Sequence, residues 1–157
     1  MVVADKQTAA KKDKEESLET RSPIIVHLDD EEQLREVAAA VIKTVFPNAI
    51  IRGFSDGEEA WLELQRSDPD LLISDRNHIG MDTCEMLRRL AYKRKQYPIL
   101  FLSGLIAADL EQYEKDCAGP GRSVTYWSKA LCTPQWLKDY LLSHLGPSDN
   151  AKRQATR

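Results

Sequence analysis

The apolar stretch Leu71-Leu72-Ile73-Ser74, which Asp75 follows directly, decides the fold. Its apolar residues do not alternate with polar ones, and such a run is typical of a strand covered on both faces in a parallel sheet. The runs at 24–28 and 99–102 have the same character, and weaker runs occupy 49–53 and 124–127. The chain therefore contains five predicted strands.

Amphipathic segments separate and follow these strands. Apolar residues at positions 34, 37, 38, 41, 42 and 45 have helical spacing. Further helices are predicted to begin after Ser55 or Asp56, after the N-cap Asp82, at about 107 (to 117), and after the N-cap Thr133. Strand and helix thus alternate five times, which predicts an α/β fold with a doubly wound five-stranded parallel sheet and five flanking helices.

The 157 residues suffice for one domain, and both ends differ in composition from the middle. Residues 1–22 and 146–157 contain few large apolar side chains, so we expect a disordered N-terminal arm and a flexible C-terminal tail around a folded domain at 23–145. This domain carries 14 basic and 19 acidic residues, which argues against nucleic-acid binding. No apolar run is long enough for a membrane span or a signal peptide, so we expect no membrane insertion and a cytoplasmic location.

The cysteines and two of the histidines give no sign of a metal site. Cys84, Cys117 and Cys132 form no CxxC pair, and their spacing indicates neither a disulfide framework nor a zinc site. We therefore expect three ordinary, partly buried thiols. His27 falls inside a predicted strand, where we expect it to pack against a helix, and His78 is expected on the surface of a loop.

Polar residues stand where the predicted strands end. Because the carboxyl ends of parallel strands meet at one edge of the sheet, we expect these side chains to lie close together. Three clustered carboxylates repel one another, and a divalent cation with oxygen ligands is the usual way to balance them; Mg²⁺ fits this ligand set. The residues concerned are Asp29, Asp30, Asp75, Asn77, Ser103, Gly104 and Lys129.

A carboxylate beside such a cation can also act as a nucleophile, and aspartyl phosphate is a known covalent intermediate. Lys129 would then pair with the phosphoryl charge, and Ser103 would donate a hydrogen bond to one of its oxygens. Taken alone, a pair such as Asp29 and Asp30 more often marks the start of a helix, so a capping role is the alternative for this pair.

The sequence resembles the receiver domain of two-component response regulators over about residues 23–145. The resemblance rests on several short segments in the same order and at fitting spacings, 45 residues from Asp30 to Asp75, 28 from Asp75 to Ser103 and 26 from Ser103 to Lys129. It implies a flavodoxin-like sheet with the strand order 2-1-3-4-5. The matching segments lie at 25–31 with Arg35 following, 55–60, 71–77, 80–82, 98–104 and 126–129.

The resemblance also implies a role for each matching residue. Asp75 matches the phosphoacceptor, and Asp29 and Asp30 match the acidic pair that holds Mg²⁺. Asn77 matches the position whose backbone carbonyl binds the metal. Ser103 and Lys129 match the hydroxyl and the ammonium that contact the phosphoryl group, and Tyr126 matches the aromatic switch residue.

The chain departs from the family pattern in two loops near this site. His78 and Ile79 precede Gly80, where the family usually has Met-Pro shortly after the phosphoacceptor, and Ala130 follows Lys129 in place of a proline in a cis peptide. The Lys129–Ala130 bond is expected to be trans, or cis under strain. These departures leave open a degenerate receiver that acts as a phosphorylation-independent interaction module.

The resemblance implies a signalling protein, not an enzyme beyond its own phosphorylation and dephosphorylation. Asp75 is expected to accept a phosphoryl group from a histidine kinase or a phosphotransfer protein in a Mg²⁺-dependent reaction, and the altered surface would bind a downstream protein. We expect a monomer or a weak dimer. A hydrolytic phosphotransferase is a weaker alternative, because Asn77 stands where that chemistry needs a second aspartate.

Overall fold

In the computed structural model, the residues that can be described are 20–76, 78–104 and 124–146. They contain one parallel five-stranded sheet in the order β2-β1-β3-β4-β5. The predicted fold class and strand order are therefore confirmed. The strands are β1 (Ile24–Leu28), β2 (Ile50–Phe54), β3 (Leu71–Asp75), β4 (Ile99–Ser103) and β5 (Val124–Ser128).

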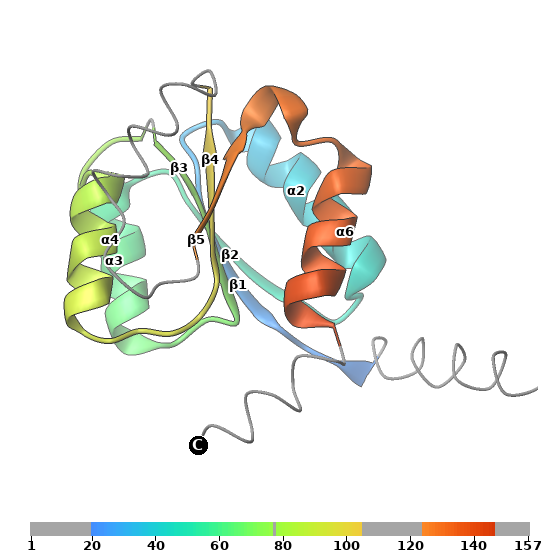
Figure 1. Ribbon diagram of the computed structural model, residues 1–157, viewed down its shortest axis with the longest axis horizontal. Coiled ribbons are helices and arrows are strands. Elements are labelled where there is room, and N and C mark those ends of the chain that lie inside the picture. The colour runs from blue at the N-terminus through green and yellow to red at the C-terminus, as the bar shows by residue number, and fades with distance from the viewer. Residues whose placement is uncertain (1–19, 77, 105–123, 147–157) are drawn as a thin grey trace, which may run out of the picture.

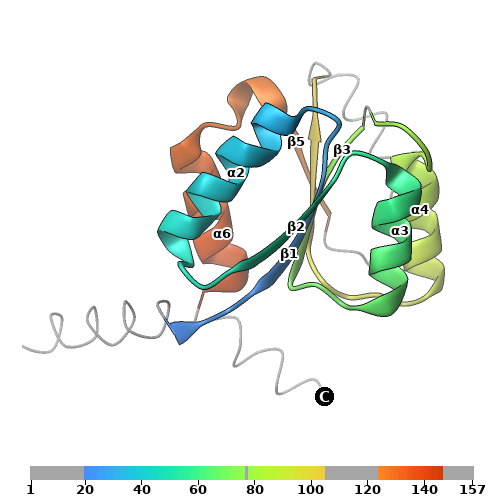
Figure 2. The same ribbon diagram turned by 180° about the vertical axis from the view of Figure 1, so that it is seen from behind.

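Helices cover both faces of the sheet (Figure 1). Helices α3 and α4 lie against one face and α2 and α6 against the other, and Figure 2 shows the same three layers from behind. Four α-helices occur in the part of the chain that the structure describes; the helix predicted at about 107–117 lies outside it. Their bounds are α2 (Glu32–Val45), α3 (Gly57–Arg66), α4 (Thr83–Tyr92) and α6 (Pro134–Leu145), and a short 3₁₀ helix, η1, spans Lys129–Leu131.

Side-chain caps begin three of these helices. The Asp56 carboxylate accepts from the backbone N–H of Glu58 at 2.7 Å, Asp82 accepts from that of Glu85, and Thr133 accepts from that of Trp136. These bonds satisfy N–H groups that the first helical turn leaves without a partner. The predicted N-caps at Asp82 and Thr133 are confirmed, and Asp56, not Ser55, caps α3.

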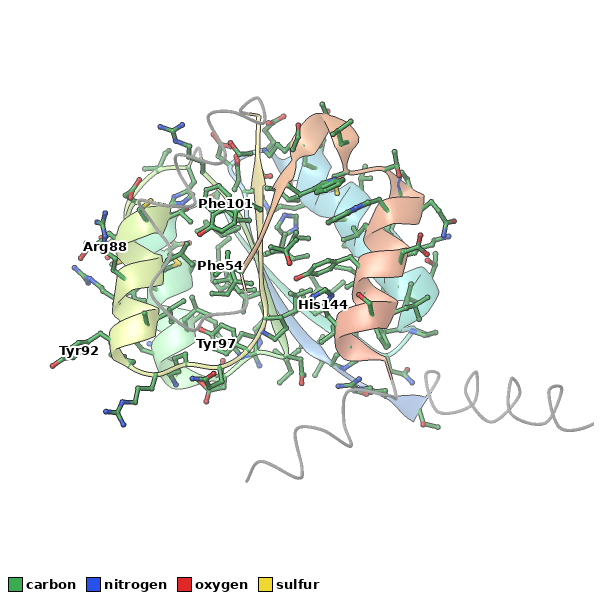
Figure 3. The ribbon with its side chains drawn as sticks, in the orientation of Figure 1. Phe54, Arg88, Tyr92, Tyr97, Phe101 and His144 are labelled. Carbon is green, nitrogen blue, oxygen red and sulfur yellow. The ribbon has the colours of Figure 1, made fainter. Side chains whose placement is uncertain are left out.

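The sheet separates two apolar cores. One joins the sheet to α3 and α4 and includes Phe101, and the other joins it to α2 and α6. Figure 3 shows Phe101 and Phe54 on the α3 and α4 side of the sheet, whereas Tyr92 points away from the molecule. Strands β3 and β4 are buried throughout, as their continuous apolar runs predict.

The cysteine prediction is wrong for Cys84. This residue, on α4, is disulfide-bonded, whereas Cys132 is a free thiol. Sequence spacing gives no warning of such a bond, because pairing depends on which residues the fold brings together.

No helix in the described ranges is both long and apolar enough to span a bilayer.

Candidate functional site

The candidate site lies at the carboxyl ends of β1, β3 and β5. Asp29 follows β1, Asp75 is the last residue of β3, and Lys129 follows β5 as the first residue of η1. The parallel sheet brings these ends to one edge, as expected from the sequence. The structure therefore brings together three of the predicted site residues that are up to 100 positions apart in the chain.

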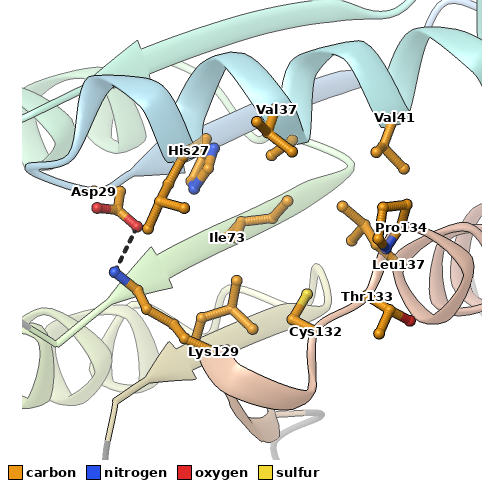
Figure 4. A pocket seen from close by; sticks show the side chains of 13 residues that line it. His27, Asp29, Val37, Val41, Ile73, Lys129, Cys132, Thr133, Pro134 and Leu137 are labelled. Carbon is orange, nitrogen blue, oxygen red and sulfur yellow. Dashed lines mark ion pairs between the residues drawn. The ribbon is translucent and has the colours of Figure 1, made fainter.

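Lys129 joins the two buried carboxylates of this edge. Its Nζ lies 2.8 Å from Oδ2 of Asp75 and 2.9 Å from Oδ2 of Asp29. Figure 4 shows the side chains of Lys129 and Asp29 pointing toward each other, and the dashed line marks their ion pair. Both aspartate side chains are only 2% exposed, so each carboxylate has exchanged most of its hydration for this ammonium.

Burial and ion pairing act in opposite directions on these groups. Burial raises the pKa of Asp75, and the hydrogen bond from Lys129 limits the rise. Burial alone would lower the pKa of Lys129, but its bonds to Asp75 and Asp29 outweigh that effect and raise the pKa above the usual 10.5. Lys129 therefore stays charged at neutral pH.

Asp30 completes an acidic cluster with Asp29 and Asp75. One carboxylate oxygen from each of the three lies within 4.8 Å of the other two. Asp30 is exposed, so the cluster opens to solvent on one side. All-oxygen, negatively charged donors at this separation fit a hard divalent cation such as Mg²⁺, which binds one or two carboxylates and keeps several waters. Asn77, the fourth predicted ligand, lies outside the described residues.

Ser103 and Tyr126 occupy the strands next to this cluster. Ser103 is the buried last residue of β4 and pairs in register with Ser128 at the end of β5. Tyr126 lies on β5 with its ring centroid 5.3 Å from that of Phe101. The predicted hydroxyl therefore lies at the same sheet edge as Asp75, and the predicted switch residue is partly buried and packs against the α3 and α4 core.

The departure at Ala130 does not displace the lysine. No described peptide bond is cis, so the Lys129–Ala130 bond is trans, and Lys129 still reaches Asp75. The turn of η1 after β5 carries the side chain to the sheet edge.

Thr83, at the start of α4, and His78, in the loop after Asp75, make contacts that the sequence did not predict. The Thr83 hydroxyl, fully buried at the first position of α4, donates to the backbone carbonyl of Asp75 at 2.8 Å. His78 Nε2 lies 2.5 Å from the same hydroxyl, so this loop residue, which is partly exposed, also contacts the start of α4. The position of Thr83 directly after a predicted N-cap was the only available signal.

Residues at the start of α2 also support the site. Asp29 Oδ1 accepts from the backbone N–H of Glu31 at 2.9 Å, and the Arg35 guanidinium donates to the Asp29 carbonyl. Glu31 also lies 3.5 Å from Lys129 Nζ. The capping alternative for Asp29 and Asp30 thus holds only in part: Asp29 contacts the turn before α2, but Glu31 is the N-cap residue.

Comparisons with known proteins agree with this geometry. No curated protein sequence matches the chain. Among solved structures, the chemotaxis protein CheY4 of Vibrio cholerae is similar with a TM-score of 0.64 and 21% identity, over 79% of this chain and 99% of that one. The signal receiver domain of a putative Luxo repressor protein from Vibrio parahaemolyticus gives a TM-score of 0.69 at 17% identity, over 87% and 97% of the two chains.

A third similar structure, a putative response regulator from Chloroflexus aurantiacus, shares 26% identity with a TM-score of 0.63 and covers 80% of this chain and 98% of its own. The family comparison matches residues 25–119 to the response regulator receiver domain. That match includes β1 apart from Ile24, all of β2, β3 and β4, and the three clustered aspartates. The chain belongs to the response regulator receiver domain family of two-component signalling.

Proposed function

We propose that Asp75 accepts a phosphoryl group and that the chain works as a phosphorylation-dependent signalling receiver. The observation that carries this proposal is the pairing of a buried carboxylate at the end of β3 with Lys129, whose Nζ is 2.8 Å away. A carboxylate held in this way has a fixed orientation, and the ammonium is in place to meet the charge of an incoming phosphoryl group.

In the proposed reaction, a carboxylate oxygen of Asp75 attacks the phosphorus atom of a phosphohistidine. The new O–P bond forms while the N–P bond of the donor breaks, and the donor imidazole keeps the electron pair. Lys129 would move from the carboxylate oxygen toward the transferred phosphoryl oxygens, and the Ser103 hydroxyl would donate to one of them.

Asp29, Asp30 and Asp75, with the backbone carbonyl of residue 77, would hold Mg²⁺ at this edge. When bound, the ion supplies positive charge that offsets repulsion between the acidic cluster and the phosphoryl group. Before it binds, Lys129 balances Asp29 and Asp75. A downstream protein would then recognise the surface that changes as Lys129 is redirected and Tyr126 repacks against Phe101.

Acetyl phosphate with Mg²⁺ tests the proposal directly. We expect the intact mass of the wild-type chain to rise by one phosphoryl group, and the fluorescence of Trp127, next to Tyr126, to change with beryllofluoride. Asp75→Asn should abolish both responses. Asp68→Asn, at an exposed aspartate that pairs with Lys95, is the matched control and should leave both unchanged.

Two results would contradict the proposal in different ways. If the wild-type chain stays unmodified and does not bind Mg²⁺, the phosphoacceptor role is wrong and the phosphorylation-independent interaction module is favoured. If Asp75→Asn is still modified, the phosphoryl group goes to another residue.

A further inference from the structure

A small cavity lies between α2 and α6, behind the phosphoacceptor site. Its volume is about 90 Å³, and its walls come from the sheet face and both helices (Figure 4). Val37 and Val41 of α2, Ile73 of β3 and Leu137 of α6 make most of the wall apolar. At one end it reaches Asp29 and Lys129, which already pair with each other.

The His27 ring is a buried polar group in the wall of this cavity. His27 lines the cavity from β1 and is 2% exposed, and neither of its ring nitrogens has a hydrogen-bond partner among the described residues. Burying an imidazole without a partner costs free energy that an aliphatic residue at the same position would not cost. A neutral imidazole has one N–H donor and one acceptor nitrogen, so each ring nitrogen can take a hydrogen-bond partner.

The cavity reaches the surface along α2. Leu34 and Val37 both line it, and their exposed fractions are 37% and 56%. A small molecule can therefore enter from solvent between α2 and the start of α6, pass the apolar wall and meet His27 at the sheet. The Asp29 and Lys129 charges cancel at the inner end, so nothing there favours a charged ligand.

We propose that this cavity binds a small, uncharged, largely apolar molecule that carries one hydroxyl group, with the hydroxyl bonded to His27. A hydroxyl both donates and accepts, so it suits either tautomer of the ring. An engineered apolar cavity of about 150 Å³ takes benzene, so a volume of about 90 Å³ fits about four non-hydrogen atoms. This ligand site does not depend on phosphorylation of Asp75, although the two sites share Asp29 and Lys129.

Titration of the full chain with 2-propanol, followed by NMR, tests the site without any phosphoryl donor. We expect saturable shifts at the His27 ring and at the methyl groups of Val41 and Leu137. Isopropylammonium, which has the same size and carries a charge, should cause none of these shifts.

Two substitutions at exposed aliphatic residues make a matched pair. Val37→Trp places a large ring at the cavity entrance and should abolish the saturable shifts, whereas Leu62→Trp on α3, across the sheet, should preserve them. His27→Leu should weaken binding about fivefold, read at the Val41 and Leu137 methyls, because one neutral hydrogen bond is lost.

The proposal is overturned if the shifts increase linearly without saturation, or if they are equal in wild type and Val37→Trp. Either result would mean that the cavity holds only water. Binding that survives His27→Leu at full strength would instead refute the hydroxyl contact, and with it the ligand class. Because none of these readouts involves Asp75, they stay separate from the test of phosphorylation.

Discussion

Lys129 is the residue on which the charge balance of the site depends. One ammonium, 19% exposed, pairs with two carboxylates that are each 2% exposed. Removing one member of a buried ion pair costs more than the pair contributes, because the remaining charge is left without compensation. Replacing Lys129 with an uncharged residue would leave two uncompensated carboxylates, those of Asp29 and Asp75, at one sheet edge.

We predict that Lys129→Met lowers the free energy of unfolding by about 2 kcal/mol at pH 7 without Mg²⁺. Urea unfolding of the two proteins measures the difference. Lys138→Met is the control, because Lys138 forms no ion pair with any described residue. This substitution should change the free energy of unfolding by less than about 0.5 kcal/mol. Equal losses in both variants would mean that the carboxylates do not need the ammonium.

The buried Tyr140 side chain makes the free energy of unfolding fall as the pH rises through the alkaline range. Burial raises the pKa of Tyr140 from 10.0 to about 12, so the folded chain keeps this proton at a pH where the unfolded chain loses it. The stabilising contribution is complete below pH 10 and is lost as the pH rises toward 12. Wild type should therefore lose about 2 kcal/mol more than Tyr140→Phe over that interval.

Chemical denaturation at pH 9 and at pH 11.5 checks this difference. Other groups, Lys129 among them, titrate in the same range in both proteins, so only the difference between wild type and Tyr140→Phe bears on Tyr140. Parallel losses in the two would contradict the prediction.

At the scale of elements, the start of α4 is tied to the end of β3. The Thr83 hydroxyl, at the first residue of α4, bonds to the carbonyl of Asp75 and contacts Ser74 and His78. The loop between β3 and α4 is also fixed to α3, because the N–H of Gly57 donates to the Ile79 carbonyl at 2.7 Å. The loop that follows Asp75 is thus anchored both at the start of α4 and at the start of α3.

Thr83→Val should destabilise the fold by about 1 to 2 kcal/mol, because the Asp75 carbonyl loses a buried donor. Thr83→Ser, which keeps the hydroxyl, should lose less than half of that. Thermal unfolding at one pH compares the three proteins. If serine and valine cost the same, the methyl group of Thr83, and not its hydroxyl, stabilises this junction.

Gly80 is required where the same loop passes α3. Its φ is +85°, and an added Cβ would lie 2.5 Å from Oδ1 of Asp56, the atom that caps α3. Gly80→Ala should therefore cost about 1 to 3 kcal/mol through backbone strain and a disturbed cap. Gly104→Ala is the matched control: its Cβ would meet no atom within 4 Å. Urea unfolding should separate the two variants clearly.

At the scale of the whole molecule, the sequence predicts the sheet better than the loops. The central strands are continuous apolar runs because both of their faces are covered, and the helix starts carry capping residues, so both can be found from the chain alone. The ends of parallel strands meet at one edge of the sheet, which explains why the sequence predicts that Asp29, Asp75 and Lys129 lie close together. These signals are local or depend only on strand order.

The features that were missed depend on the paths of side chains and loops. The contact between His78 and Thr83 and the disulfide bond of Cys84 need residues to meet in space at positions that no spacing pattern marks. The cavity beside His27 follows from how closely α2 and α6 approach the sheet, which the amphipathic pattern of each helix does not determine.

The long sequence separation between Asp29 and Lys129 has a consequence for synthesis. The ribosome completes β1 and β3, with their two carboxylates, well before the strand that delivers the ammonium. A nascent chain that ends near residue 104 can pair four strands, but it must leave Asp29 and Asp75 without their lysine. Collapse of the sheet around these carboxylates is therefore penalised until β5 has left the ribosome, which favours late, cooperative closure of this sheet edge.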